Sequence, residues 1–148
     1  MKTLIIRHRR ENLKKCSLRG LEGKEGYAFL TYPKDPMPND LSSYFVLALG
    51  APVLSEEDKD LALLLIDGTW RLASRIQKML PAPFIARSLP MGYLTAYPRR
   101  QEDCSDPTQG LASIEALYLA HKILGRPLEG LLDNYHWRDL FLERNRLV

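Results

Sequence analysis

The chain has 148 residues, of which 45% are hydrophobic, and a formal net charge of +3. This size suits one compact domain with its own core, and two separate domains are not expected. No apolar stretch is long enough to span a bilayer, and no hydrophobic signal segment follows the first charges, so we expect a cytoplasmic protein that does not bind membranes. Cys16 and Cys104 lie far apart in sequence, which argues against a zinc site or a disulfide scaffold.

The positive charge is concentrated in two segments. Residues 1–24 carry eight Lys or Arg and two Glu, and residues 68–101 carry six Lys or Arg and no acid. If both segments fold onto one face, they form the kind of surface that binds a phosphate backbone. Charged segments are more often ordinary solvated surface, so both interpretations stay open at this point.

Short apolar segments in the first part of the chain predict strands. Residues 4–6 and the aromatic segment 27–32 have the composition of strands, and Pro33 ends the second. Residues 44–49 form another apolar run, which fits a strand or a helical turn. Ser55, which is followed by three acidic residues, predicts a short capped helix.

The most informative segment is an apolar run at residues 63–66, which ends abruptly in an aspartate, a glycine, a threonine and a tryptophan at residues 67–70. Such a run is typical of a buried strand in a parallel sheet. Apolar residues recur at helical spacing over residues 70–80, so we predict a strand, a tight turn and a helix, with Thr69 as the N-cap. The polar residues would then lie at the carboxyl end of the strand, where open α/β sheets bind ligands. The alternative is an ordinary capped junction without a ligand.

The remainder of the chain is predicted to contain a short strand, a long loop and two helical regions. Two prolines end the preceding helix, and residues 84–90 form a short strand and loop. A polar connection over residues 95–110 has little periodicity, and loops of that length are often functional. Residues 111–124 predict a helix that Gly125 terminates, and a last helical region covers about residues 128–144.

Strands therefore concentrate in the first two thirds of the chain and helices at the end. This order predicts an α/β fold with a mostly parallel sheet and a helical carboxyl-terminal portion. We expect residues 1–90 to form the α/β part, which carries the N-terminal strands and the turn from Asp67 to Trp70. Residues 91–148 would form a mostly helical part that completes the same site.

Four motifs resemble the DTW-domain family in their order and spacing. They are Leu65-Ile66-Asp67-Gly68-Thr69-Trp70-Arg71-Leu72-Ala73, Arg87-Ser88-Leu89-Pro90, Tyr97-Pro98-Arg99-Arg100 and Leu111-Ala112-Ser113-Ile114-Glu115-Ala116. A second resemblance, to the related rRNA aminocarboxypropyltransferases, rests on Lys14-Lys15-Cys16-Ser17, on Leu89-Pro90 and on residues 131–145. Together the two resemblances cover most of the chain except residues 33–60. The cysteine-rich amino-terminal segment of many DTW-domain proteins is absent here.

The resemblance implies an RNA aminocarboxypropyltransferase, which transfers a 3-amino-3-carboxypropyl (acp) group from S-adenosylmethionine to a uridine-derived base. It also implies a fold similar to the knotted SPOUT methyltransferases, with a trefoil knot in the carboxyl-terminal part. Threaded connections are rare among proteins, so the knot is expected from the resemblance alone. Because the cysteine-rich segment is missing, both rRNA and tRNA stay open as the RNA partner. The oligomeric state also stays open.

The same resemblance implies which residues would contact S-adenosylmethionine. Ser17 follows the first strand, the backbone of Ile66 would lie beside the ribose, and Leu89 would lie near the adenine. Gln109 and Ser113 would contribute from the final loop and the start of the following helix. The implied binding site therefore draws on both parts of the chain.

Trp70 and Ala73 would flank the alkyl groups of the sulfonium. The sulfonium carries three carbons, and the carbon that faces the nucleophile decides which group is transferred. Orientation of the donor is therefore the main determinant of the reaction, and an indole ring also attracts a cation through its face. The alternative for Trp70 is a core aromatic residue that anchors the helix.

Asp67 has two candidate roles. Its carboxylate could pair with the sulfonium, but that charge disappears during transfer, so the pairing would favour binding and orientation more than rate. It could instead act as a catalytic base that accepts the ring-nitrogen proton of the target base, at a cost of about 1.4 kcal/mol for each pKa unit to be overcome. We prefer the orienting role. Glu115 could buttress the preceding loop, and neither a metal site nor a Ser-His-Asp arrangement is indicated.

Several basic residues are candidates for contacts with RNA phosphates, since guanidinium and ammonium groups are strong phosphate donors. Their alternative role is solubility, or for Arg87 an internal ion pair. The candidates are Arg9, Arg10, Lys14, Arg87, Arg99 and Arg100.

Two other functions remain alternatives. The first is methyl transfer to RNA from the same cofactor, because the implied fold serves that chemistry elsewhere. The second is a non-catalytic RNA-binding or ribosome-assembly factor that keeps the fold without turnover.

Overall fold

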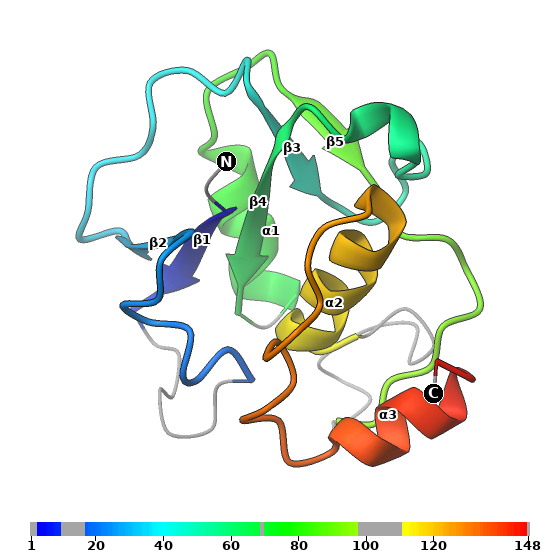
Figure 1. The fold of residues 1–148 in the computed structure, drawn as a ribbon. Helices are drawn as coiled ribbons and strands as arrows, with labels where there is room; N and C mark the ends of the chain where they lie inside the picture. Colours follow the sequence, from blue (N-terminus) through cyan, green and yellow to red (C-terminus); the bar gives the residue numbers. More distant parts are fainter. Residues whose placement is uncertain (1–2, 10–16, 69, 98–110, 148) are drawn as a thin grey trace.

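The computed structural model describes residues 3–9, 17–68, 70–97 and 111–147. These residues form one sheet of five parallel strands in the order β2-β1-β4-β3-β5 (Figure 1). The strands are β1 (Thr3–His8), β2 (Tyr27–Tyr32), β3 (Tyr44–Leu47), β4 (Ala62–Asp67) and β5 (Ile85–Arg87). The helices are the short 3-10 helix η1 (Glu56–Asp58), α1 (Trp70–Lys78), α2 (Ser113–Leu124) and α3 (Arg138–Arg144).

The two central strands are buried on both faces. In β1 all six residues are buried, and in β4 only Ile66 is half-buried. Buried parallel strands of this kind read as continuous apolar runs, because helices cover both sides of the sheet. The register places Ile5 opposite Leu65 and, at the carboxyl end, Arg7 opposite Asp67.

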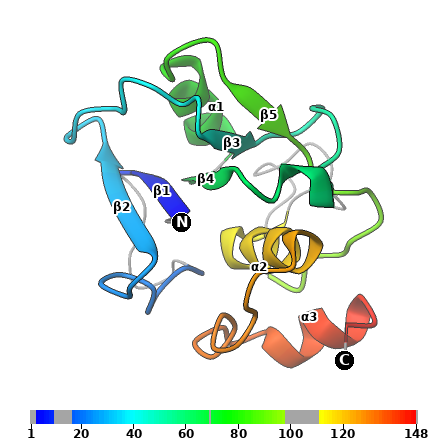
Figure 2. The same ribbon diagram turned by 45° about the horizontal axis from the view of Figure 1, so that its top comes forward.

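The molecule has three layers. Figure 2 shows the sheet between α1 on one side and α2 on the other, with α3 beyond α2. Side chains alternate along each strand, so each face of the sheet has its own core. On the α1 side, Leu4, Ile6 and Leu64 pack with Ile76 and Leu80.

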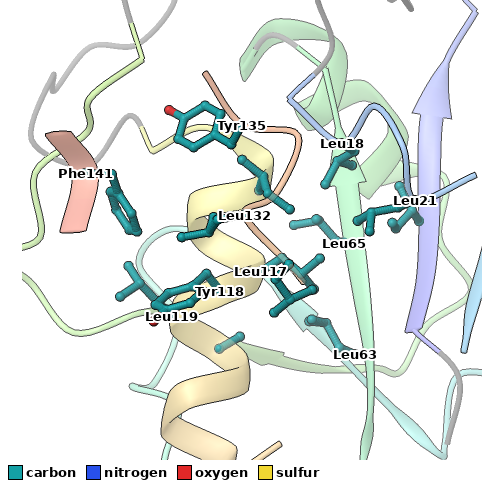
Figure 3. Close-up of a cluster of buried hydrophobic side chains, with 14 of the residues drawn as sticks. Leu18, Leu21, Leu63, Leu65, Leu117, Tyr118, Leu119, Leu132, Tyr135 and Phe141 are labelled. Carbon is teal, nitrogen blue, oxygen red and sulfur yellow. The ribbon is translucent and has the colours of Figure 1, made fainter. Parts of the chain in front are cut away.

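The α2 side holds the larger cluster of buried residues. Figure 3 shows strand residues such as Leu63 and Leu65 facing Leu117 of α2, with Leu132 and Phe141 on the far side of the helix. This cluster contains residues of both predicted parts, 1–90 and 91–148. The helical carboxyl-terminal portion therefore shares one core with the sheet.

Most of the predicted elements are confirmed. The structure has strands at Tyr27–Tyr32 and at Tyr44–Leu47, and the second of these excludes the helical turn that was the alternative. Ser55 accepts a hydrogen bond from the backbone of Glu57 and caps η1. Gly125 terminates α2 in the left-handed conformation at φ 71°, which glycine adopts without steric cost.

The predicted helical region over about residues 128–144 is wrong in its first half. Residues 128–137 form successive turns, and α3 begins only at Arg138. Gly130 has a positive φ of 78°, which interrupts a helix. The turns allow Leu131, Leu132 and Tyr135 all to be buried against α2 and the sheet.

The prediction of a mostly parallel sheet is confirmed, since every strand pair is parallel. The trefoil knot stays a prediction, because residues 98–110, which connect into α2, lie outside the described residues. Within the described part of the chain, no helix is long and apolar enough to cross a membrane.

Candidate functional site

The candidate site lies at the carboxyl edge of the sheet, between β1 and β4. The chain leaves β1 toward its neighbour β2 on one side, whereas it leaves β4 toward β5 on the other side. Strand connections thus diverge between these two strands, and open α/β sheets bind ligands at such switch points. The amino-terminal end of α2 lies at the same edge of the molecule (Figure 1).

Asp67 is the polar centre of this edge. Its side chain is only 4% exposed. Oδ2 accepts a hydrogen bond from Nε of Arg7 at 3.3 Å, and Oδ1 accepts one from Oγ of Ser113 at 2.6 Å. The carboxylate is therefore held in one orientation by residues from β1 and α2, which supports a positioning role rather than one that requires it to move.

Arg7 is the counterion of this carboxylate and links it to the surface. The guanidinium also contacts Oε2 of Glu22 at 3.3 Å, and its Cζ lies 4.7 Å from the centre of the Phe29 ring. Burial raises the pKa of Glu22, but the backbone N–H groups of Glu22 and Gly20 and the charge of Arg7 outweigh it, so its pKa lies below the ordinary value. Arg7 thus stands between two carboxylates and an aromatic face, a stable environment for a buried cation.

Ser17 joins the amino-terminal part of the chain to the start of α2. Its Oγ accepts a hydrogen bond from the backbone N–H of Ile114 at 3.1 Å, across 97 positions in the sequence. The N-cap residue of α2 is Ala112, whose side chain cannot accept such a bond. Ser17 therefore satisfies an amide that a local cap would normally satisfy. The dipole of α2 also favours the negative charge of Asp67, which accepts a hydrogen bond from Ser113 in the first turn of this helix.

Glu115 is a second buried carboxylate, with no exposed surface. It accepts hydrogen bonds from the backbone N–H of Ala112 (2.7 Å), the backbone N–H of Ala96 (2.8 Å), the hydroxyl of Thr95 (2.7 Å) and the hydroxyl of Tyr135 (2.8 Å). Thr95 and Ala96 lie at the start of the predicted connection over residues 95–110, and Ala112 follows its end. The expectation that Glu115 buttresses this loop is confirmed, since one side chain holds both of its ends.

The structure brings together three of the predicted cofactor residues: Ser17, Asp67 and Ser113. Leu89 is half-buried and packs against the cluster on the α2 side. The side chain of Ile66 packs on the α1 side, so only its backbone is available for the predicted ribose contact. Ala73 is half-buried in the first turn of α1.

Several predicted residues cannot be placed. The residues outside the described ranges are Arg10, Lys14, Thr69, Arg99, Arg100 and Gln109, and the side chain of Trp70 is not described. Their predicted roles stay predictions.

The two described RNA candidates differ in their surroundings. Arg9 follows β1 directly and is exposed, and its backbone N–H donates to the carbonyl of Tyr32. Arg87 is half-buried, with its Nε 3.2 Å from both carboxylate oxygens of Asp58. The structure therefore shows for Arg87 the internal ion pair that was the alternative to a phosphate contact.

Arg7 is a site residue that was not predicted from the sequence. It belongs to a basic segment, but a charge near the end of an otherwise apolar strand is unusual and could have indicated it. Tyr135 was not predicted either, because it lies in a segment predicted to be helical. Among the described residues, no three His, Cys, Asp or Glu side chains are grouped as a metal would require.

The carboxyl edge of the sheet holds side chains that could bind a cofactor with a positive charge and hydroxyl groups. Asp67 supplies a carboxylate, and Ser17 and Ser113 supply hydroxyls beside the start of α2. Leu89 adds apolar surface. Ligand sites combine apolar lining with a few such fixed polar groups.

No protein-family model and no curated protein matches the chain significantly. The solved structures include a similar one, the SAM-dependent rRNA:acp-transferase Tsr3 from Vulcanisaeta distributa. Its structure superposes with a TM-score of 0.73 over 99% of this chain and 79% of the other, at 23% sequence identity. The chain therefore has the fold of this transferase.

Proposed function

We propose that the chain is an S-adenosylmethionine-dependent transferase that places an acp group on a uridine-derived base of RNA. The observation that carries the proposal is the meeting of Ser17, Asp67 and Ser113 at the switch point of the sheet, across 46 and 97 sequence positions. The similarity in fold to the rRNA:acp-transferase over nearly the whole chain supports the same activity. It also makes rRNA the first substrate to test, ahead of tRNA. A knotted, SPOUT-like connection into α2 is part of this proposal.

S-adenosylmethionine supplies an activated carbon next to a sulfonium when it is bound. Asp67 would attract and orient the cation, and Arg7 and Ser113 would hold its carboxylate in place. Trp70 and Ala73 would enclose the alkyl groups that are not transferred. Positioning of this kind can contribute a large share of the rate of a displacement reaction. The base role of Asp67 stays the alternative.

A double-label experiment tests the proposed reaction. The protein is incubated with rRNA, or separately with tRNA, and with donor labelled either in the methyl group or in the carboxypropyl group. The proposal expects only the carboxypropyl label in RNA. Methyl label would indicate an RNA methyltransferase, and neither label would favour a non-catalytic RNA-binding factor.

Asp67→Asn distinguishes the two roles of the carboxylate. The orienting role predicts that the dissociation constant for S-adenosylmethionine rises by about tenfold, the effect expected for a charge-assisted contact of roughly 1.4 kcal/mol. Asp133→Asn, the same change at an exposed residue, should leave the constant unchanged. Calorimetry measures both variants. Unchanged affinity with lost turnover would contradict the orienting role and favour the base.

A further inference from the structure

A groove lies between the loop after β5 and the end of α3. Its volume is about 320 Å³. We call it the Tyr93 groove, and the residues that line it are Met91, Gly92, Tyr93, Arg144, Asn145 and Arg146. No function in the preceding sections uses these residues.

Side-chain hydrogen bonds hold the two walls of the groove together. The backbone N–H of Leu94 donates to Oδ1 of Asn145 at 2.7 Å, and Nδ2 of Asn145 donates to the carbonyl of Leu94 at 2.8 Å. Nη1 of Arg144 donates to the carbonyl of Thr95 at 2.7 Å. In addition, the fully buried Phe141 anchors α3 in the core. The groove is therefore a fixed feature of the fold.

The lining combines positive charge with flat or apolar surface. Arg144 and Arg146 are exposed, and none of the described lining residues is acidic. Tyr93 packs against the core while it lines the groove, and Met91 is 81% exposed. Guanidinium groups bind phosphate, and an aromatic ring stacks on a nucleobase of any sequence. This combination fits a nucleotide of a single strand.

The groove is connected to the candidate site through the same loop. Thr95, which accepts from Arg144 through its carbonyl, donates through its hydroxyl to Glu115. Glu115 in turn holds the backbone of Ala112, next to Ser113 and its bond to Asp67. The groove and the candidate site are therefore joined by a chain of hydrogen bonds that runs through Thr95 and Glu115.

We propose that the Tyr93 groove binds a nucleotide of single-stranded RNA beside the reacting base, with Arg146 and Arg144 on the phosphate and Tyr93 under a base. This inference rests on the proposed function, because it names the surface that holds the RNA substrate. It assigns RNA contacts to the end of α3 and the loop after β5, in addition to the basic residues near the amino terminus.

Fluorescence anisotropy with a labelled single-stranded RNA of about 12 nucleotides tests the groove. Arg146→Gln should weaken binding about fivefold at low salt, and the slope of log affinity against log salt should fall by about 0.7, the contribution of one phosphate contact in a single strand. Lys34→Gln removes a positive charge from an exposed position after β2, at the opposite edge of the sheet from β5 and outside both basic segments, and should change neither quantity.

A second pair of variants tests the ring. Tyr93→Leu keeps apolar packing and should weaken binding by about fivefold or more, because base stacking on an aromatic side chain is lost. Tyr93→Phe keeps the ring and should restore the affinity. If thermal unfolding shows that Tyr93→Leu does not fold, the RNA affinity and salt slope of Arg146→Gln alone decide whether the groove binds RNA.

The inference is overturned if Arg146→Gln and Tyr93→Leu both bind RNA with the affinity and salt slope of the wild type. It is also overturned if the wild-type protein binds no RNA. An equal loss in Lys34→Gln would also overturn it, since binding would then be a property of total charge. The outcome is separable from the proposed function. If wild type transfers the acp label and the groove variants bind RNA normally, only the groove proposal is rejected. If RNA binding depends on the groove but no label is transferred, only the proposed activity is rejected.

Discussion

Asp67 and Glu115 are both buried carboxylates at the same end of the molecule, yet they are stabilised in different ways. Asp67 is paired with the guanidinium of Arg7 and accepts a hydrogen bond from the hydroxyl of Ser113. Glu115 accepts from two backbone amides and two hydroxyls, none of which carries a charge. A buried charge needs compensation, which an ion pair or several neutral donors can supply.

The difference indicates different roles. Arg7 and Ser113, which bond to Asp67, lie on β1 and α2, so its carboxylate is fixed at the edge where a ligand is expected. The partners of Glu115 lie at both ends of a long connection and in the turn around Tyr135, so this carboxylate organises the chain. Asp67 is therefore positioned to contact a ligand, whereas Glu115 is positioned to hold segments of the chain together.

The largest expected effect is that of Arg7→Met. This change removes the cation and leaves Asp67 buried and without its counterion, so the free energy of unfolding should fall by about 3–5 kcal/mol. Equilibrium unfolding in urea measures the loss. The double variant Arg7→Met/Asp67→Asn, which removes both charges, should recover much of it. A loss below about 1 kcal/mol in the single variant would mean that Asp67 does not depend on this partner.

Glu115→Gln should have the next largest effect. Glutamine keeps the shape but turns one acceptor oxygen into an amide donor that faces other donors, so the free energy of unfolding should fall by about 2–3 kcal/mol. Tyr135→Phe removes a single donor and should cost about 1 kcal/mol.

Hydrogen exchange gives this prediction a second readout. The amides of Ala96 and Ala112 bond to different oxygens of Glu115, so one of the two should lose protection in Glu115→Gln, and both should keep it in Tyr135→Phe. Equal protection of both amides in all three proteins would contradict the organising role of Glu115.

His121 extends the comparison to a buried base, and His121→Gln should have the smallest effect on the free energy of unfolding. Its side chain is 8% exposed, Nδ1 lies 3.0 Å from the carbonyl of Pro127, and no hydrogen-bond partner for Nε2 is found among the described residues. Burial lowers its pKa below the ordinary value of 6.5, the bond to Pro127 opposes this, and the charge of Arg126 adds to it.

Between the lowered pKa of the folded state and about pH 6.5, the unfolded chain therefore binds a proton at this position that the folded chain does not bind. The stability contributed by neutral His121 is present above that pH and is lost as the pH falls through and below it. Urea unfolding at pH 7.5 and 5.5 should show a smaller pH dependence for His121→Gln than for wild type. An identical pH dependence would show that His121 does not titrate differently in the folded state.

Local patterns in the sequence were sufficient for most elements of the fold. The apolar run before Asp67 predicted a buried parallel strand, because its composition and length exclude a half-exposed strand. The apolar spacing before Gly125 predicted α2, and Gly125 itself marked its end. The helix predicted for residues 128–137 is wrong because leucines that are buried from consecutive turns give the same composition as leucines on one face of a helix.

The sequence by itself therefore determined that the chain is an α/β protein with polar residues at the end of a central strand. Only the tertiary structure decided that Arg7 faces Asp67, that Ser17 caps α2, and that Arg87 is bound to Asp58. These contacts depend on which strands are neighbours and on the side from which α2 covers them. Local periodicity encodes the type of each element but carries no information on that order.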